Sequence, residues 1–321
     1  MNHIALEAAL NKMYNGFEER GLKARIVSIR HLPELQAEVQ SRYAQGQLAE
    51  EFYQERMDFY RFRPPDDFPS PRCLIVVAVP RPQTPVSFTH DGKSLTLILP
   101  PTYSGFSEVI HDIGDCLNSI LRGIGYRAVK AVLPLKLLAV RSGLAEYGRN
   151  NIGYTPGMGS FFQLVGYYSD LPCLEDSWQE PRMMERCKNC RACQKACPTD
   201  AISPDRFLLH AERCLVFHNE RPQVHPFPAW IDPAAHNCLM ACMLCQRICP
   251  VDKPFMDWFK DSQDFSAKET ALLLQGTPRH ELPEKTAKKL EALGLIDDVD
   301  KFPRNLGVFF GINGETLRKQ V

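Results

Sequence analysis

The chain has 321 residues, with 38 basic and 38 acidic side chains and a formal net charge of zero. This balance gives no indication of a surface that coats nucleic acid. No stretch reaches the roughly 18 apolar residues that a membrane span requires. Residues 1–19 mix charged and apolar side chains and lack the continuous apolar region of a signal peptide. We therefore expect a cytoplasmic protein of about two domains, without a membrane span.

The first part of the chain alternates helical and strand patterns. Helices are predicted over residues 4–20, 33–60 and 106–121, and strands over 25–29, 73–79 and 94–99. The run 73–79 is continuously apolar up to Pro80, as expected for a strand buried on both faces. Asp91-Gly92 precedes the last strand and predicts a hairpin turn. This mixture is sufficient for a sizeable α/β core.

A glycine-rich segment follows, with glycines at positions 143, 148, 153, 157 and 159. Glycine tolerates positive φ and lets the backbone approach a ligand closely. Taken alone, the segment indicates either a ligand-binding loop or ordinary turns.

Two cysteine runs are the most specific feature of the chain. They read Cys187-x2-Cys190-x2-Cys193-x3-Cys197-Pro198 and Cys242-x2-Cys245-x3-Cys249-Pro250. This is the ligand pattern of a two-cluster [4Fe–4S] ferredoxin, in which the last cysteine of each run binds the cluster of the other run. Structural zinc favours two separated cysteine pairs, and disulfides favour short secreted domains. We therefore predict a protein that transfers electrons.

The exchange of the last cysteines assigns every cluster ligand except one. The first cluster takes Cys187, Cys190, Cys193 and Cys249. The second takes Cys197, Cys242 and Cys245 and needs a fourth ligand, for which Cys214 and Cys238 compete. Cys238 and Cys242 are four residues apart and would share one face of a helix. Spacing alone leaves both candidates open.

The predicted fold class is α+β, with three parts. An α/β domain covers residues 1–180, and a ferredoxin-like domain covers 181–255. The second domain has short helices and little apolar sequence, so its folding is expected to depend on metal. Residues 256–321 form a short helical tail that packs on the body, with one helix from Ser266 to Leu274 and another from Pro283, ended by Gly294.

The glycine-rich segment and the cysteine runs together resemble epoxyqueuosine reductase and, more distantly, the cobalamin-dependent reductive dehalogenases. The matching segments are Arg141–Asn150, Gly159-Ser160-Phe161, Asp170-Leu171-Pro172 and the two cysteine motifs, within about residues 125–255. Arg149 stands where the family has Lys. The family also has a ligand Cys after an Arg between the two motifs, which matches Arg213-Cys214 and favours Cys214 over Cys238.

The resemblance implies a cobalamin held between a domain related to the nitroreductase fold and the ferredoxin-like domain. Electrons from a low-potential donor such as ferredoxin or flavodoxin would pass through the two clusters and reduce the cobalt. The implied cofactor-binding residues are Gly143, Tyr147, Gly148, Arg149, Asn150, Gly159, Ser160 and Phe161. Among them, the glycine amides and Ser160 would contact the corrin edge, and Tyr147 or Phe161 would pack against its face.

Departures from the family bear on the reaction. The family has an acidic residue, proposed as the proton donor, ahead of the Arg-x-Gly-Leu segment. Residues 128–136 contain no acid here and two lysines, Lys130 and Lys136. These lysines belong to a solvated helix face, or contact an anionic substrate, or include an acid whose pKa is lowered by burial. The family's aromatic-histidine motif is also missing, and Tyr103 lies in a comparable region, so the catalytic candidates are these three residues.

The repeat-type helical tail that helps many epoxyqueuosine reductases hold tRNA is absent or replaced, so we do not expect tRNA as a partner. The leading interpretation is a reductase that uses two clusters and cobalamin on a small-molecule or nucleoside substrate. One alternative is a ferredoxin-like relay that delivers electrons to a corrinoid or another partner without catalysis of its own. Another is an enzyme that uses a flavin instead of cobalamin.

Overall fold

The computed structural model describes residues 3–312, and its contacts divide the chain into two compact units. Unit 1 comprises residues up to 80, 107–191 and 206–208, and unit 2 comprises 81–106, 192–205 and 209 onward. Each unit therefore combines segments that lie far apart in the sequence. The domain boundaries expected near residues 180 and 255 stay predictions.

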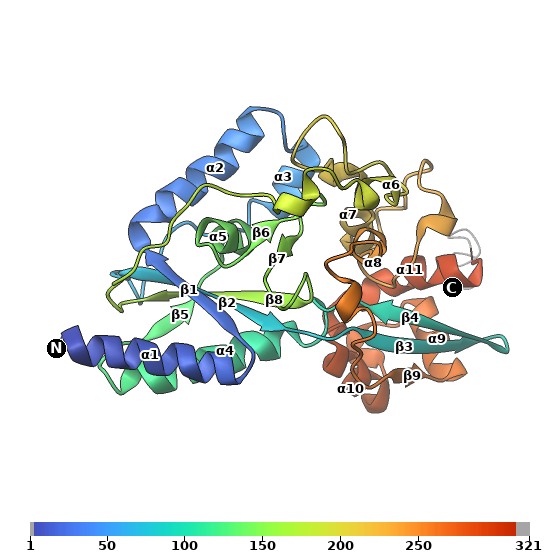
Figure 1. Ribbon diagram of the computed structural model, residues 1–321. Helices are drawn as coiled ribbons and strands as arrows, with labels where there is room; N and C mark the ends of the chain where they lie inside the picture. Colours follow the sequence, from blue (N-terminus) through green and yellow to red (C-terminus); the bar gives the residue numbers. More distant parts are fainter. Residues whose placement is uncertain (1–2, 313–321) are drawn as a thin grey trace. The chain divides into compact units, whose positions relative to one another are not determined.

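Unit 1 is an α+β unit built on a four-stranded antiparallel sheet of order β1-β2-β8-β5 (Figure 1). Its elements are α1 (His3–Glu19), β1 (Lys23–Ser28), α2 (Leu32–Ala44), α3 (Glu50–Arg56), β2 (Cys73–Pro80), α4 (Phe106–Arg122), β5 (Ala128–Lys130), α5 (Leu135–Arg141), β6 (Glu146–Tyr147), β7 (Gly153–Tyr154) and β8 (Phe162–Ser169). The helices predicted over 4–20 and 106–121 and the strands predicted over 25–29 and 73–79 are confirmed.

Strand β2 explains the continuous apolar run because both faces of its sheet are covered. Successive side chains of a strand point to opposite faces. Leu74 and Val76 enter one core with side chains of α2 and α5, whereas Ile75 and Val77 enter another with side chains of α1 and α4. Figure 1 shows these helix pairs on opposite sides of the sheet. Full burial of each such side chain stabilises the fold by about 1.5–3 kcal/mol.

The single helix expected over 33–60 is instead two helices, α2 and α3. The chain between them turns at Gly46, whose φ is 67°. A left-handed residue cannot continue a right-handed helix, and glycine takes that conformation without a steric penalty. The helical spacing of apolar residues continues on both sides of this turn, so the sequence pattern alone predicted one helix.

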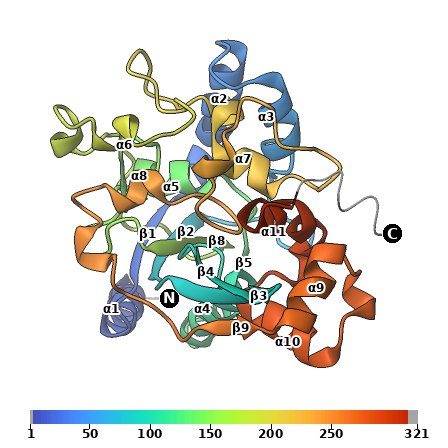
Figure 2. The same cartoon turned by 90° about the vertical axis from the view of Figure 1, so that its right-hand side faces the viewer.

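Unit 2 packs three helices on a three-stranded sheet of order β4-β3-β9 (Figure 2). Its elements are β3 (Thr84–His90), β4 (Lys93–Leu99), α6 (Ala192–Lys195), α7 (Leu215–Glu220), α8 (Leu244–Arg247), β9 (Gln263–Phe265), α9 (Ala267–Gln275), α10 (Glu284–Leu293) and α11 (Phe302–Phe310). The hairpin β3–β4 is confirmed, with Asp91 and Gly92 at φ 47° and 73° as a two-residue hairpin turn requires.

The C-terminal helices are also confirmed. Ser266 Oγ accepts a hydrogen bond from the Glu269 N–H, and the Glu269 carboxylate accepts one from the Ser266 N–H, which forms a capping box at the start of α9. Gly294, with φ 72°, ends α10. These helices share one core with the hairpin, since Phe88 and Leu97 lie in the same apolar cluster as Leu290. Strand β9, which pairs with β3 in parallel, was not predicted.

No helix within residues 3–312 combines the length and the apolar character that crossing a membrane requires.

Candidate cluster-binding and cofactor-binding site

All twelve cysteines lie in the described part of the chain, and none of them forms a disulfide. Cys193 lies in α6 and Cys245 lies in α8, and these two short helices pack against each other in unit 2. The fold thereby brings together segments of the two cysteine runs. Cys187 and Cys190 are counted with unit 1, because the division between the units falls after Arg191.

Three cysteines predicted for the second cluster are neighbours. The Cys214 thiol interacts electrostatically with Cys242 and with Cys197. Cys214 lies just before α7 in an extended conformation, with φ −71° and ψ 130°. Within residues 3–312 no three His, Cys, Asp or Glu side chains are grouped to share a single ion. A cubane makes a different demand, because each of its four irons takes one thiolate.

The prediction that Cys238 and Cys242 share one face of a helix is wrong. The chain between them is irregular, and Ala241 has a φ of 62°, which a right-handed helix excludes. The Ala241 carbonyl accepts a hydrogen bond of 2.6 Å from Asn219 Nδ2. Cys238 is buried, and its Sγ donates to Asn237 Oδ1 at 3.2 Å. The Cys238 thiol interacts electrostatically with Cys242 and with Arg247.

Burial keeps these thiols protonated in the metal-free protein. Burial is the largest cause that raises the pKa of Cys214 and of Cys238 to about 12, and the electrostatic interaction with Cys242 contributes to both values. Burial also raises the pKa of Cys242. Because iron binds thiolates, loading a cluster at neutral pH would release protons from this site.

The glycine-rich segment folds into a compact loop around the small sheet β6–β7 in unit 1. The Gly143 N–H donates to the Val140 carbonyl at 3.1 Å, and the Gly148 N–H donates to the Ile152 carbonyl at 2.8 Å. A Cβ at residue 148 would lie 2.4 Å from Cε2 of Tyr154. Packing against Tyr154 therefore requires glycine at position 148. The Gly143 amide is hydrogen-bonded to the end of α5, and the Gly148 amide is hydrogen-bonded within the loop.

Most of the other predicted cofactor-binding residues are buried. Phe161 is fully buried, and its N–H donates to Met158 at 3.0 Å. Asn150 Nδ2 donates to the Tyr154 hydroxyl at 3.0 Å. Buried as well are Tyr147, whose ring meets that of Phe207 edge-on at 5.2 Å, and Ser160, which follows Gly159 with its φ of 56°.

Arg149 reaches from this loop to the first cysteine run. Its Nη2 donates to the Cys187 carbonyl at 2.6 Å and to the Lys188 carbonyl at 3.3 Å. Its Nε donates to the Cys190 carbonyl at 3.0 Å. All four residues belong to unit 1. The structure therefore joins the two motifs that the sequence presents as separate.

The three catalytic candidates have different environments. Lys130 is exposed on strand β5, and Lys136 is exposed on α5. Lys130 therefore does not lie on a helix, and the side chains of both lysines are exposed to solvent. Tyr103 is half-buried in unit 2, and its hydroxyl donates to Glu220 Oε1.

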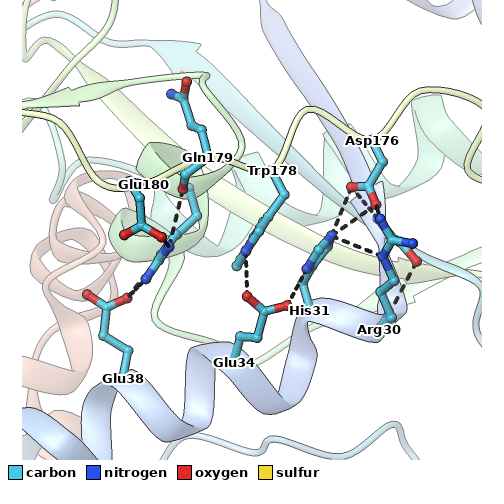
Figure 3. Close-up of polar contacts among 10 residues, drawn as sticks. Arg30, His31, Glu34, Glu38, Asp176, Trp178, Gln179 and Glu180 are labelled. Atoms are coloured by element: carbon cyan, nitrogen blue, oxygen red, sulfur yellow. Dashed lines mark hydrogen bonds and ion pairs between the residues drawn. The ribbon is translucent and has the colours of Figure 1, made fainter.

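A polar network in unit 1 was not predicted at all (Figure 3). The irregular segment 173–182, called the strap here, lies along α2. Arg141 pairs with Glu38 at 2.6 Å and with Glu180 of the strap at 3.0 Å. Trp178 of the strap stacks on buried His31, with ring centroids 4.3 Å apart. The partners are too distant in sequence for any local pattern to reveal them.

Both ring nitrogens of His31 face carboxylates. Nδ1 lies 2.6 Å from Glu34 and Nε2 lies 2.9 Å from Asp176. The hydrogen bond with His31 is the main reason that the pKa of Glu34 is lowered. Burial alone would raise the pKa of Asp176, but hydrogen bonds from His31 and from the Ser28 N–H outweigh it and lower the pKa. Both acids are thus held ionised beside the histidine.

Comparison with known proteins supports the cysteine assignment. Residues 186–252 match the family model of the 4Fe-4S double cluster binding domain. This match covers both cysteine runs and the segment between them.

Curated relatives match the middle of the chain. An epoxyqueuosine reductase of Synechococcus sp. (strain CC9605) is 32% identical over 140 residues, which are 43% of this chain and 42% of that protein. A tetrachloroethene reductive dehalogenase of Dehalobacter restrictus (strain DSM 9455 / PER-K23) is 30% identical over 154 residues, 44% of this chain and 27% of that protein. The matches thus span less than half of either relative, and they confirm the resemblance inferred from the motifs.

Solved structures share the fold over nearly the whole chain. The epoxyqueuosine reductase from Streptococcus thermophilus superimposes with a TM-score of 0.65 at 18% identity, over 96% of this chain and 83% of that one. An epoxyqueuosine reductase solved with an epoxyqueuosine-modified tRNA-Tyr stem loop gives a TM-score of 0.67 at 18% identity, over 98% and 84%. That complex corrects our expectation about tRNA, because a protein with this fold does bind it.

Proposed function

We propose that this protein is an iron–sulfur reductase in which two [4Fe–4S] clusters reduce a bound cobalamin that acts on a small-molecule or nucleoside substrate. The observation that carries the proposal is the pair of cysteine runs, matched by the double-cluster family model over residues 186–252. The resemblance to epoxyqueuosine reductases and reductive dehalogenases adds the reductase activity. A fold shared with epoxyqueuosine reductases over nearly the whole chain supports it.

The proposed ligand sets follow the cysteine exchange. The first cluster takes Cys187, Cys190, Cys193 and Cys249, and the second takes Cys197, Cys214, Cys242 and Cys245. The mutual proximity of Cys214, Cys197 and Cys242 supports the second set and favours Cys214 over Cys238. When loaded, the clusters supply one-electron transfer from a donor such as ferredoxin or flavodoxin.

Cobalamin belongs to the proposal through the resemblance, together with a nitroreductase-like core and the boundaries near 180 and 255. The loop residues predicted to contact the corrin are engaged in contacts within the protein. The amides of Gly143 and Gly148 already donate to backbone carbonyls, and Phe161 is fully buried. These residues shape the loop, so we assign none of them a step in the reaction. Gly159 and Ser160 belong to the same loop, and we assign them the same role of shaping it.

The test is the iron and cobalt content of protein prepared anaerobically with cobalamin supplied. Two clusters predict about eight irons per chain. Near-stoichiometric cobalt beside that iron would support the reductase, and full iron without cobalt would exclude cobalamin as the resident cofactor. Iron well below about four per chain would contradict the cluster assignment itself.

The electron relay is the second candidate, and two observations favour it. Residues 128–136 contain no acid, and the loop amides are already hydrogen-bonded. A relay would hold eight irons, lack cobalt and pass electrons to an added corrinoid protein. The flavin alternative would give a yellow chromophore and an absorbance band that neither other candidate has.

The substrate class is tested directly with the ligand of the structural neighbour. We would mix the reduced protein with an epoxyqueuosine-modified tRNA-Tyr stem loop and with the free nucleoside. Conversion of the stem loop alone would identify a tRNA substrate, and conversion of the nucleoside would identify a small-molecule reductase.

A further inference from the structure

We propose that Arg149 is the positioning residue of the first cluster. Its guanidinium fixes the loop that carries Cys187 and Cys190 and raises the reduction potential of the cluster bound there. This inference rests on the two clusters of the proposed function, but not on cobalamin or on the identity of the substrate.

The geometry of the contact is specific. One guanidinium donates to three carbonyls of the same loop, those of Cys187, Lys188 and Cys190, at 2.6, 3.3 and 3.0 Å. Hydrogen bonds from a charged donor are about twice as strong as those between neutral groups. Arg191 adds bonds to the same Lys188 and Cys190 carbonyls at 3.0 and 3.1 Å, but only from within the loop itself.

Arg149 can position the loop because its own backbone is fixed. It lies in a tight turn closed by the bond from the Gly148 N–H to Ile152 at 2.8 Å. The buried Asn150 side chain also accepts the Ile152 N–H at 3.2 Å. Asn151 Nδ2 donates to the Phe207 carbonyl at 2.8 Å. A side chain carried on such a turn has little freedom to follow a moving cysteine loop, so the loop is held to it.

The electrostatic consequence follows from the charge of a cluster. Reduction adds negative charge, and a nearby cation stabilises the reduced form and so raises the potential. The peptide plane adds a second effect. In a trans peptide the N–H points opposite to the carbonyl, so the N–H groups of Asn189 and Arg191 are turned away from the guanidinium. Amides in such loops donate to cluster sulfur, which also tunes the potential.

Substitution of Arg149 by lysine distinguishes the effect of its charge from the effect of its hydrogen-bond geometry. Arg carries five donors in a rigid fork, whereas Lys carries one compact ammonium on a flexible stem. Arg149→Lys keeps the charge but loses the multiple contacts, and Arg149→Gln loses the charge and most contacts. Arg206 supplies a matched control, because its guanidinium also binds two carbonyls, Leu208 at 2.7 Å and Gln47 at 3.1 Å, outside both cysteine runs.

The experiment is an anaerobic redox titration followed by electron paramagnetic resonance on the full-length wild type, Arg149→Gln, Arg149→Lys and Arg206→Gln, with iron determined for each. We expect one cluster of Arg149→Gln to shift to lower potential while the other stays at its wild-type value. Arg149→Lys should shift less, and Arg206→Gln should not shift.

Loss of about half the iron in Arg149→Gln, with a smaller loss in Arg149→Lys and full retention in Arg206→Gln, would equally support positioning. Two unchanged potentials at full iron in Arg149→Gln would overturn the inference. The same shift or iron loss in Arg206→Gln would also overturn it, because a general loosening of unit 1 would then explain the result. Failure of the proposed function is distinguishable, since the wild type itself would then lack iron, if the cluster assignment is wrong, or hold full iron without cobalt, if only the cobalamin is wrong.

Discussion

At the scale of single residues, two arginines of the segment 141–150 connect separate parts of unit 1. Arg141 connects α2 to the strap through Glu38 and Glu180. Arg149 connects the same loop to the carbonyls of the first cysteine run. Each of the two side chains is fixed by two or more partners, as expected for a residue that stabilises the fold. A motif that predicts a family therefore does not by itself identify the residues that touch a substrate.

The fourth ligand of the second cluster can be tested by two matched substitutions. Cys214→Ser should lower the iron content from about eight to about four per chain, because a cubane without its fourth thiolate is lost or degraded. Cys238→Ser should leave the iron content unchanged, since the Cys238 thiol is a buried donor to Asn237. Iron analysis and absorbance near the cluster band would measure both. The reverse result would assign the ligand to Cys238.

Glu269 provides a prediction about acid stability. Burial alone would raise its pKa, but hydrogen bonds from Lys289 and Ser266 outweigh it and lower the pKa from 4.5 to about 2. The lowered pKa stabilises the fold above pH of about 4.5, by at most about 3 kcal/mol, and this stability is lost as the pH falls toward 2. Glu269→Gln should therefore be destabilised most at pH 7.

The measurement for Glu269 is chemical denaturation of wild type and Glu269→Gln at pH 7 and pH 4, in the same cluster state. The difference in unfolding free energy should shrink by about 1 kcal/mol at pH 4, where the unfolded glutamate is largely protonated. A difference that does not depend on pH would show that the ion pair with Lys289, 2.8 Å long, contributes little.

At the scale of elements, the sequence was sufficient wherever a local rule decided the structure. The run of β2 indicated burial on both faces, and Asp91-Gly92 identified the hairpin turn. Strand β9 escaped prediction because only three residues, Gln263–Phe265, pair with β3, and tertiary contact rather than periodicity selects them. The break at Gly46 was missed because the helical spacing continues on both sides of it.

The Arg141 ion pairs hold the strap together with two backbone hydrogen bonds, from the Gln179 N–H to the Arg141 carbonyl and from the Tyr147 N–H to the Arg182 carbonyl, both at 2.8 Å. Removing the Arg141 side chain should therefore loosen the strap. Arg141 and Glu38 both have 14% of their side-chain surface exposed. Arg141→Met would remove the closer of the two arginines that pair with Glu38 and leave Arg42 at 3.4 Å, so the cost should stay below the roughly 3 kcal/mol of a fully broken buried pair. We expect faster limited proteolysis within residues 173–182 and a lower unfolding temperature.

Arg30→Met is the control for the strap. Arg30 also pairs with the strap, at 2.8 Å to Asp176, but its side chain is 72% exposed. Exposed pairs contribute at most about 1 kcal/mol. Equal proteolysis of both variants would mean that the contacts of His31 and Trp178, and not the Arg141 pair, hold the strap.

At the scale of the whole molecule, the assembly of each unit from distant segments could not be read from the sequence. The hairpin β3–β4 and the last helices share a core although more than half of the chain lies between them. The cysteine pattern, by contrast, was read directly, because cluster ligation imposes local spacing. The C-terminal residues carried no recognised chemistry, and their contribution became visible only as contacts within unit 2.

Asn305 of α11 makes the strongest case for that contribution. Its side chain is buried, and its Nδ2 donates to the carbonyls of Asn219 and Leu239, both at 2.9 Å. Asn219 lies on α7, the helix that begins directly after Cys214, and Leu239 lies three residues before Cys242. One amide thus ties together two segments that carry predicted ligands of the second cluster. Asn305→Leu keeps a similar volume but removes this donor from the Leu239 carbonyl, which costs about 1–3 kcal/mol for a buried group, whereas the Asn219 carbonyl keeps the hydrogen bond from Arg304 Nη2 at 3.2 Å.

We therefore expect Asn305→Leu to unfold at lower temperature and to lose iron from one cluster faster during exposure to a chelator. Thr286→Val is the matched control, because Thr286 is equally buried in the same unit, and its hydroxyl binds Glu269 at 3.3 Å rather than the cysteine segments. Comparable iron loss from both variants would show that general stability of unit 2 governs cluster retention. Faster loss from Asn305→Leu alone would show that α11 holds the ligand segments in place, because only that variant removes a bond to their backbone.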